Sequence, residues 1–352
     1  MNKNNMHVFQ IGPRGQGGVD TVICSLIESS LEKDYQFVRI ETTRGKRKLF
    51  PFVIALIKCL IIKNNSCCLA HIHMASKGSF LRKRIIIKML HRKKIPIIIH
   101  LHGAKFREFF SLSTKRQKNN IISTFNIADK VIVLTEDWLS FADSLGVINK
   151  TVVIPNFTNV PDIITNKESQ MINILFLGRV GERKGTFDLV RAFEIVIHKM
   201  GIRNVKLIIG GDGELEELRR IVRKLDIVDF VEVVGWLSER QKEEVLLYGD
   251  ILVLPSYFES FGLSLVEGMS YGLPVIGTKA GSIPSVVRDN IDGLLITAGD
   301  INQLAKTIKI LVNDKQLRTS MGQNGRAHVI NEYSETVVCN KIRRLYEELV
   351  IG

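Results

Sequence analysis

The sequence predicts an α/β protein of two domains, each built on a doubly wound parallel sheet. The chain has 352 residues, about twice the size of a typical domain. Short apolar runs alternate with longer segments of helical spacing. The runs are continuous in Val, Ile and Leu, as in parallel strands that are buried on both faces. The composition, 45% hydrophobic and 24% charged, excludes a mostly disordered chain.

Two series of strands are predicted, separated by a polar stretch at 158–170 that we expect to be a linker. This predicts an N-terminal domain over 1–160, a C-terminal domain over 161–335 and a helical segment over 336–352 that could pack back on the N-terminal domain. The predicted strands are 7–11, 35–40, 69–74, 95–101, 130–135 and 151–155 in the first series, and 172–177, 205–209, 230–234, 251–255, 274–277 and 294–297 in the second.

No targeting or membrane-spanning segment is evident. The N-terminal residues form no apolar signal core. The most apolar stretch, 50–62, is about half the length that spans a bilayer, and it contains Lys58. The five cysteines form no Cys-x-x-Cys pair, so no disulfide framework is predicted. We therefore expect a cytoplasmic protein.

Positive charge is concentrated in the predicted N-terminal domain. The formal net charge is +13, and residues 1–160 carry 25 Lys and Arg against 10 Asp and Glu. From Thr42 to Arg107 there are 16 Lys or Arg and no acid. We expect this surface to associate with the anionic inner face of the cell membrane. A solvated helix face and nucleic-acid binding are the alternatives. Nucleic acid is disfavoured because the stretch lacks aromatic residues spaced for base stacking.

One basic helix is predicted within this stretch. Helical spacing places Leu81, Ile85 and Met89, together with Ile86 and Leu90, on one side. We expect this side to pack on the sheet and the basic side chains to face away from it.

Ligands of open α/β sheets bind at the carboxyl ends of strands, so the turns that follow strands are candidate sites. The first turn, at 12–18, contains four glycines. They allow close approach of a ligand and lead into a helix whose N-terminus favours an anion. Such turns occur in many nucleotide-binding folds.

Two turns of the predicted C-terminal domain have similar features. Arg179 and Lys184 follow its first strand, and two cations there suit a pyrophosphate, with a solvated loop as the alternative. Gly211 and Gly213 follow its second strand, where they could leave room for a nucleotide.

Glu259 and Glu267 are eight residues apart around a third strand-to-helix turn. A helix is predicted to begin near Gly262, which leaves the backbone N–H groups of 261–264 free to meet a phosphate or sugar oxygen. Glu267, in the second helical turn, could reach a ribose hydroxyl pair. Two surface glutamates are the alternative.

This Glu-x7-Glu segment resembles the retaining glycosyltransferases of family 4, which have the GT-B fold of two Rossmann-like domains facing a central cleft. The resemblance covers nearly the whole chain and is strongest over 172–298. The other matching segments, in their expected order, are Gly17-Gly18, His100-Leu101-His102-Gly103, Gly178-Arg179, Lys184-Gly185, Gly211-Asp212-Gly213, Gly272-Leu273-Pro274-Val275 and Gly293-Leu294-Leu295. Two positions depart from the family's pattern: Gly268 replaces an Ala, and 281–285 lacks a Glu.

The resemblance implies a role for each matching residue. Arg179 and Lys184 would neutralise the donor diphosphate. Glu259 would bind hydroxyls of the donor sugar, with His102 nearby, and these four residues form the expected catalytic set. Glu267 would bind the ribose. The other expected donor contacts are Gly17, Gly18, Gly211, Gly213, Gly235, Trp236, Leu237, Phe261, Gly262 and Leu263, of which 235–237 would hold the base.

The implied activity is transfer, with retention, of a hexose or N-acetylhexosamine from a nucleotide-diphosphate sugar, UDP being favoured over GDP. The acceptor would be a lipid-linked saccharide in surface polysaccharide or O-antigen assembly. Preorganised cations can stabilise a leaving phosphate. Because no convincing Asp-x-Asp motif is found, we expect no cofactor and no divalent metal.

Several alternatives to this activity are compatible with the sequence. Four histidines, at 71, 73, 100 and 102, could form a zinc site, but no acid or cysteine pattern supports one. The GT-B fold also carries epimerases and phosphorylases. The alternative outside the enzymes is an inactive protein that associates with a membrane or binds nucleic acid. The presence of Arg179, Lys184, Glu259 and Glu267 favours an active transferase.

Overall fold

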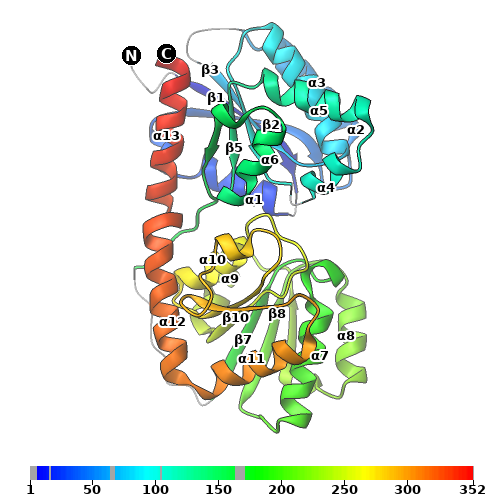
Figure 1. Cartoon of the computed structure of the whole chain (residues 1–352), viewed down its shortest axis with the longest axis vertical. Helices are drawn as coiled ribbons and strands as arrows, with labels where there is room; N and C mark the ends of the chain where they lie inside the picture. Colours follow the sequence, from blue (N-terminus) through cyan, green and yellow to red (C-terminus); the bar gives the residue numbers. More distant parts are fainter. Residues whose placement is uncertain (1–5, 16, 64–67, 104, 163–170, 352) are drawn as a thin grey trace. The chain divides into compact units, whose positions relative to one another are not determined.

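The computed structural model describes residues 6–15, 17–63, 68–103, 105–162 and 171–351 (Figure 1). The chain forms two compact units. Unit 1 comprises Met1–Asn156 and Glu335–Gly352, and unit 2 comprises Phe157–Ser334. Most of the predicted linker, 163–170, lies outside the described residues.

Each unit contains one six-stranded parallel sheet, which confirms the predicted α/β architecture. In unit 1 the strand order is β2-β1-β3-β4-β5-β6. The central strands β3 and β4 are buried along their whole length, as their continuous apolar character predicts. The strands are β1 (His7–Arg14), β2 (Gln36–Arg44), β3 (Cys68–Met74), β4 (Ile97–Leu101), β5 (Lys130–Val133) and β6 (Thr151–Val153).

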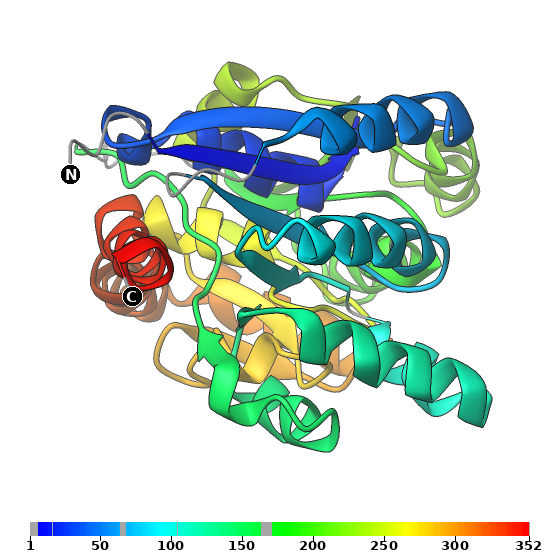
Figure 2. The same cartoon turned by 90° about the horizontal axis from the view of Figure 1, so that it is seen from above.

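Helices of unit 1 cover both faces of its sheet. Helices α2 (Leu49–Ile61), α3 (Gly78–Arg92) and α5 (Lys115–Ile127) lie side by side (Figure 2). The C-terminal helix α13 (Glu335–Ile351) packs on β3 and on the turn at Ser30–Lys33. The other helices of this unit are α1 (Gly18–Ile27), α4 (Phe106–Ser111) and α6 (Leu139–Ser144).

The two faces of β3 have different chemistry because side chains alternate along a strand. Cys68, Ala70, Ile72 and Met74 belong to the apolar core that includes residues of α2, α3 and α5. The alternate positions carry His71 and His73, which therefore point to the opposite face.

The predicted packing face of helix α3 is wrong in part. Leu81 and Ile85 are exposed, at 59% and 50%, whereas Phe80 and Ile87 are buried with Ile86 and Leu90. Three consecutive isoleucines, 85–87, allow two phases of the apolar stripe, and a helix that covers a sheet buries only one such stripe. The stripe that begins at Phe80 is the buried one.

In unit 2 the strand order is β12-β11-β10-β7-β8-β9. The first strand, β7, lies at the centre, and the direction of winding reverses between β7 and β10. This order is typical of doubly wound nucleotide-binding folds. The strands are β7 (Ile172–Leu177), β8 (Val205–Gly210), β9 (Val231–Gly235), β10 (Ile251–Val253), β11 (Val275–Thr278) and β12 (Gly293–Ile296).

Helices α7 and α12 of unit 2 both end in a π-helical turn, at Ile195–Lys199 and Val329–Tyr333 respectively. The helices are α7 (Thr186–Glu194), α8 (Leu215–Lys224), α9 (Glu239–Tyr248), α10 (Leu263–Ser270), α11 (Ile301–Asn313) and α12 (Lys315–His328). Three of these helices confirm predictions from the sequence. Helix α7 with its π-helical turn matches the segment predicted at 187–199, α8 that at 215–225 and α11 that at 301–312.

Candidate active site

The reversal of winding in unit 2 brings two loops together. Strands β7 and β10 are hydrogen-bonded neighbours, and both run in the same direction. The loops that follow their carboxyl ends, at 178–185 and 254–262, are therefore adjacent. Ligands of open parallel sheets bind at such a point. Arg179, Lys184 and Glu259 all lie in these two loops.

One buried ion pair joins the two loops. Lys184 Nζ lies 2.5 Å from Glu259 Oε1, and the side chains are 16% and 9% exposed. Ser256 Oγ donates to the same carboxylate oxygen at 2.8 Å, and Arg183 Nη1 lies 3.8 Å from it. The carboxylate is thus held in place by groups from both loops. It can still accept hydrogen bonds from a ligand's hydroxyl groups, because an ionised carboxylate has about four acceptor positions.

Arg179 lies in a more open position at the end of β7. Its side chain is 65% exposed, and Nη1 pairs with Asp212 Oδ2 at 3.1 Å. Asp212 lies in the loop after β8. Since exposed ion pairs contribute only about 0–1 kcal/mol, the guanidinium can turn to another anion at small cost.

Gly211 and Gly213 pack closely against the loop that follows β7. The sequence had instead suggested that these glycines leave room for a nucleotide. A Cβ on Gly211 would lie 1.8 Å from the carbonyl oxygen of Gly178, and one on Gly213 would lie 2.2 Å from that of Val180. The Val180 N–H donates to the Asp212 carbonyl at 2.6 Å. The glycines therefore let the loop after β8 support the loop that carries Arg179. Their predicted contact with the donor stays a prediction.

Helix α10 begins beside Glu259. Gly262 caps it in the left-handed conformation, with φ 85° and ψ 49°. Among the described residues, no protein acceptor is found for the backbone N–H groups of 261–264. A helix N-terminus with unpaired N–H groups attracts an anion or a sugar oxygen.

Glu267, in the second turn of α10, is paired with a lysine that the sequence did not single out. Lys242 Nζ, from α9, lies 2.7 Å from Glu267 Oε1 and 2.8 Å from Glu239 Oε2. Burial opposes protonation of this lysine, but the two carboxylates outweigh it and raise the pKa of Lys242. Both glutamates of the Glu-x7-Glu segment therefore have a lysine partner.

The remaining predicted donor contacts are spread over both units. In unit 2, Gly235 ends β9, and the Trp236 ring that follows is 53% exposed. Leu237 contacts the end of β8, because its Cδ1 lies 2.7 Å from a Cβ placed on Gly210. In unit 1, Gly17 and Gly18 open helix α1, and a Cβ on either would meet nothing within 4 Å.

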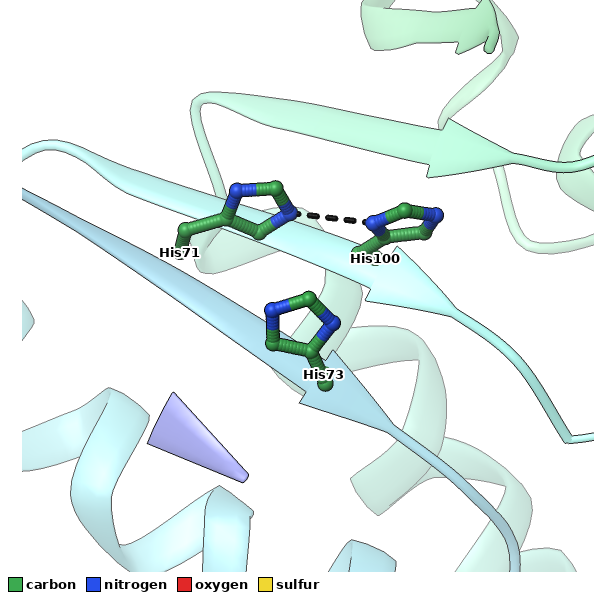
Figure 3. A group of neighbouring side chains, drawn as sticks. All are labelled: His71, His73 and His100. Atoms are coloured by element: carbon green, nitrogen blue, oxygen red, sulfur yellow. Dashed lines mark hydrogen bonds between the residues drawn. The ribbon is translucent and has the colours of Figure 1, made fainter. Parts of the chain in front are cut away.

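His102 belongs to a buried histidine cluster on the sheet of unit 1. His102 Nε2 lies 2.9 Å from His73 Nδ1, and His71 Nε2 lies 3.0 Å from His100 Nδ1. Figure 3 shows the second of these hydrogen bonds and the ring of His73 beside it. Two neighbouring elements bind the cluster. Gln10 Oε1 of β1 lies 2.7 Å from His73 Nε2, and the Tyr346 hydroxyl of α13 lies 2.6 Å from His71 Nδ1.

Burial lowers the pKa of His71 and of His102 to about 3, so these rings are neutral near pH 7. The pKa of His73 and that of His100 are also lowered, mainly by burial.

A metal does not fit this cluster well. Ligand atoms of His71, His73 and His100 lie within 4.8 Å of one another, which is close enough for a shared ion. However, both ring nitrogens of His71 and of His73 already have hydrogen-bond partners. No carboxylate is among the hydrogen-bond partners of these rings in the described part of the chain, and a buried cation needs such compensation. A neutral hydrogen-bond network accounts for the arrangement, although His100 Nε2 is buried without a partner among the described residues.

Sequence comparisons point to one class of enzyme. Residues 159–328 match the model of the family described as glycosyl transferases group 1. An uncharacterized glycosyltransferase of Methanocaldococcus jannaschii is 29% identical over 307 residues, which cover 82% of this chain and 78% of that protein. The capsular polysaccharide biosynthesis glycosyltransferase CapM of Staphylococcus aureus is 30% identical over 174 residues, 49% of this chain and 44% of CapM.

A structural comparison agrees with the fold. The crystal structure of Anabaena HepE in complex with UDP and glucose has a TM-score of 0.74 and 17% identity, covering 98% of this chain and all of that one. The findings support a GT-B glycosyltransferase.

Several partners of the candidate residues were not predicted from the sequence. Ser256 lies three residues before Glu259 and carried no separate signal. Lys242 of α9 reaches Glu267 of α10 through a side-chain contact between two separate helices, and Asp212 approaches Arg179 through the pairing of β7 with β8. These contacts depend on tertiary structure, so no spacing in the sequence indicates them.

We predict that Gly211→Ala lowers the stability of unit 2 more than Gly201→Ala does. Both glycines have positive φ, 146° and 69°. At Gly201 an added Cβ meets nothing within 4 Å. The substitution there should lower the free energy of unfolding only by the cost of holding an L-amino acid in the left-handed conformation, about 1–2 kcal/mol. At Gly211 the neighbouring loop must also move. Urea unfolding compares the two variants, and equal losses would contradict the packing role.

Acid should destabilise the protein through the histidine cluster. Between the usual histidine pKa of 6.5 and the folded value of about 3, the unfolded chain binds protons that the folded chain excludes. The free energy of unfolding therefore falls as pH falls through this window, by about 1.4 kcal/mol per pH unit for each such histidine.

The acid effect can be separated from lost packing with two variants. Urea unfolding at about pH 7, 6 and 5 should show a smaller pH slope for His71→Asn than for the wild type. Ile72→Val, in the same strand, should lose stability and keep the slope. An unchanged slope in His71→Asn would show that the cluster does not titrate as described.

Proposed function

We propose that this protein is a retaining glycosyltransferase of family 4 that uses a nucleotide-diphosphate sugar as donor. The observation that carries the proposal is the Lys184–Glu259 pair, held where β7 and β10 end and next to the amides of 261–264. The pair places a cation for a phosphate and an acceptor for sugar hydroxyls at one point. The matches to glycosyltransferases support this assignment.

The reaction breaks the bond between the anomeric carbon and the donor phosphate oxygen. Negative charge develops on the leaving diphosphate, and Arg179 with Lys184 stabilises that charge electrostatically. The acceptor hydroxyl oxygen forms the new bond to the anomeric carbon from the same side, and its proton passes to the leaving phosphate oxygen. This scheme requires no protein nucleophile and no divalent metal or other cofactor.

The donor is proposed to be a UDP-sugar carrying a hexose or N-acetylhexosamine, with a GDP-sugar as the second choice. A UDP complex of a protein with a similar fold supports this order. The exposed Trp236, with Gly235 and Leu237, would hold the base. Glu267 would bind the ribose through the carboxylate that Lys242 orients.

The acceptor is proposed to be a lipid-linked saccharide in surface polysaccharide or O-antigen assembly. The similarity to a capsular polysaccharide enzyme supports this class. The excess of Lys and Arg in residues 1–160 supports association with the inner face of the cell membrane. No helix among the described residues is long and apolar enough to cross a membrane.

Lys184→Ala should abolish stabilisation by UDP. A ligand at about 100 times its Kd stabilises a protein by roughly 2.7 kcal/mol, which a thermal-shift titration detects easily. The matched control is Lys206→Ala, which removes a lysine paired with Glu232 at 2.5 Å on the early part of β8 and β9.

We expect the control to keep the UDP shift. GDP, ADP and CMP in the same titration identify the preferred base. If no nucleotide stabilises the wild type, or if Lys184→Ala responds like the wild type, the proposed donor site is wrong.

A further inference from the structure

Helix α2 of unit 1 has an apolar outer surface. Its inner positions Pro51, Ala55 and Cys59 are buried. Phe52 and Leu56 are partly buried against the core of unit 1. Seven other large apolar side chains are exposed, from 38% at Ile54 to 77% at Leu49. We call these residues the α2 face, and they are Leu49, Phe50, Val53, Ile54, Ile57, Leu60 and Ile61.

This pattern is unusual for a helix at the surface of a soluble domain. Such a helix normally carries polar residues on its outer side. In α2, Lys58 is the single charged or polar side chain among its 13 residues. Apolar patches of this kind mark sites where a protein binds another protein or a membrane.

Basic residues surround the α2 face. Arg44, Lys46, Arg47 and Lys48 immediately precede the helix, and all four are exposed. At the other end, Lys93 donates to the carbonyl oxygens of Leu60 and Ile62.

Helix α3 packs beside α2 (Figure 2). Its sequence contains the same combination of apolar and basic residues. It adds exposed Leu81 and Ile85, together with exposed Lys88 and Arg92.

The basic residues around the α2 face, which form a cationic border, favour an anionic membrane over a second copy of this chain as the partner. No acidic residue occurs between Thr42 and Arg107, so a second copy of this chain would bring two cationic borders together. An anionic bilayer instead offers negative headgroups above an apolar interior. An in-plane helix with an apolar face and basic surroundings is suited to that boundary. At 13 residues, or about 20 Å, α2 is too short to span a bilayer.

We propose that the α2 face inserts into the boundary between headgroups and acyl chains of an anionic membrane, while Arg44–Lys48 and the exposed Lys88 and Arg92 of α3 contact the headgroups. This deepens the membrane association of the proposed function, on which it rests. It names the inserting element and makes the attachment partly hydrophobic. Salt should therefore weaken the binding without abolishing it, since salt screens charges and leaves apolar burial intact.

The test uses the full chain with vesicles of phosphatidylcholine alone or containing phosphatidylglycerol. The α2 variant carries Phe50→Ser, Ile57→Ser and Ile61→Ser. The matched control carries Ile291→Ser, Ile310→Ser and Ile330→Ser, which removes three exposed apolar side chains from unit 2.

We expect wild type and control to sediment with the anionic vesicles, and the α2 variant to partition at least about tenfold more weakly. At about 0.5 M salt, part of the wild-type binding should persist.

Insertion is distinguished from surface adsorption by Phe50→Trp. The wild type already contains Trp138 and Trp236, so the fluorescence of the new tryptophan is the difference between the variant's spectrum and that of the wild type. This difference emission should shift to the blue on anionic vesicles. Lipids brominated on the acyl chain should quench it. Unshifted emission, equal binding of the α2 variant, or complete loss of wild-type binding in salt would each overturn the proposal.

Two further measurements identify the cause of a failure. If the α2 face joins two copies, the wild type is a dimer in lipid-free solution, the α2 variant is a monomer, and neither binds vesicles; this result overturns membrane insertion. The UDP thermal shift should be the same in the α2 variant and the wild type. A wild-type protein that shows the UDP shift but does not bind anionic vesicles refutes only the membrane proposal. A wild-type protein that binds the vesicles without any nucleotide shift refutes only the donor proposal.

Discussion

The ion pair between Lys184 and Glu259 is the interaction on which the candidate site depends. It joins two loops that are more than 70 residues apart in the chain, and it can form because β7 and β10 are neighbours at the point where the winding of the sheet reverses. Around it, the packing of Gly211 against Gly178 supports the loop that carries Arg179, and Gly262 starts helix α10 beside the carboxylate. The charges of Lys184 and Glu259 are thus fixed before a ligand arrives, which is how a site gains electrostatic stabilisation without reorganisation.

The sequence predicted what is determined by local patterns. Each of the twelve strands in the described part of the chain overlaps a predicted run, because buried parallel strands are continuous apolar segments. The loops with Arg179, Lys184 and Glu259 were identified because glycines and charges directly follow such runs. Taken one at a time, these residues could equally belong to solvated surface loops. The similarity to glycosyltransferases gave them one common function.

Tertiary contacts account for what the sequence did not predict. The partner of Glu267 is Lys242 on another helix, and the partner of His71 is Tyr346, 275 residues away in the chain. The phase of α3 was ambiguous because Ile85–Ile87 are equally apolar, and only packing on the sheet decides which of them is exposed. For the same reason the exposed α2 face was not foreseen, since its residues have the composition of a buried segment.

We propose that a nucleotide binds where β7 and β10 end. Hydrogen exchange followed by mass spectrometry, with and without saturating UDP-glucose, tests it most directly because it reports on backbone amides without any substitution. We expect slower exchange in peptides covering 178–185 and 256–264 when UDP-glucose is bound. Bound nucleotide with unchanged exchange in both segments would contradict it.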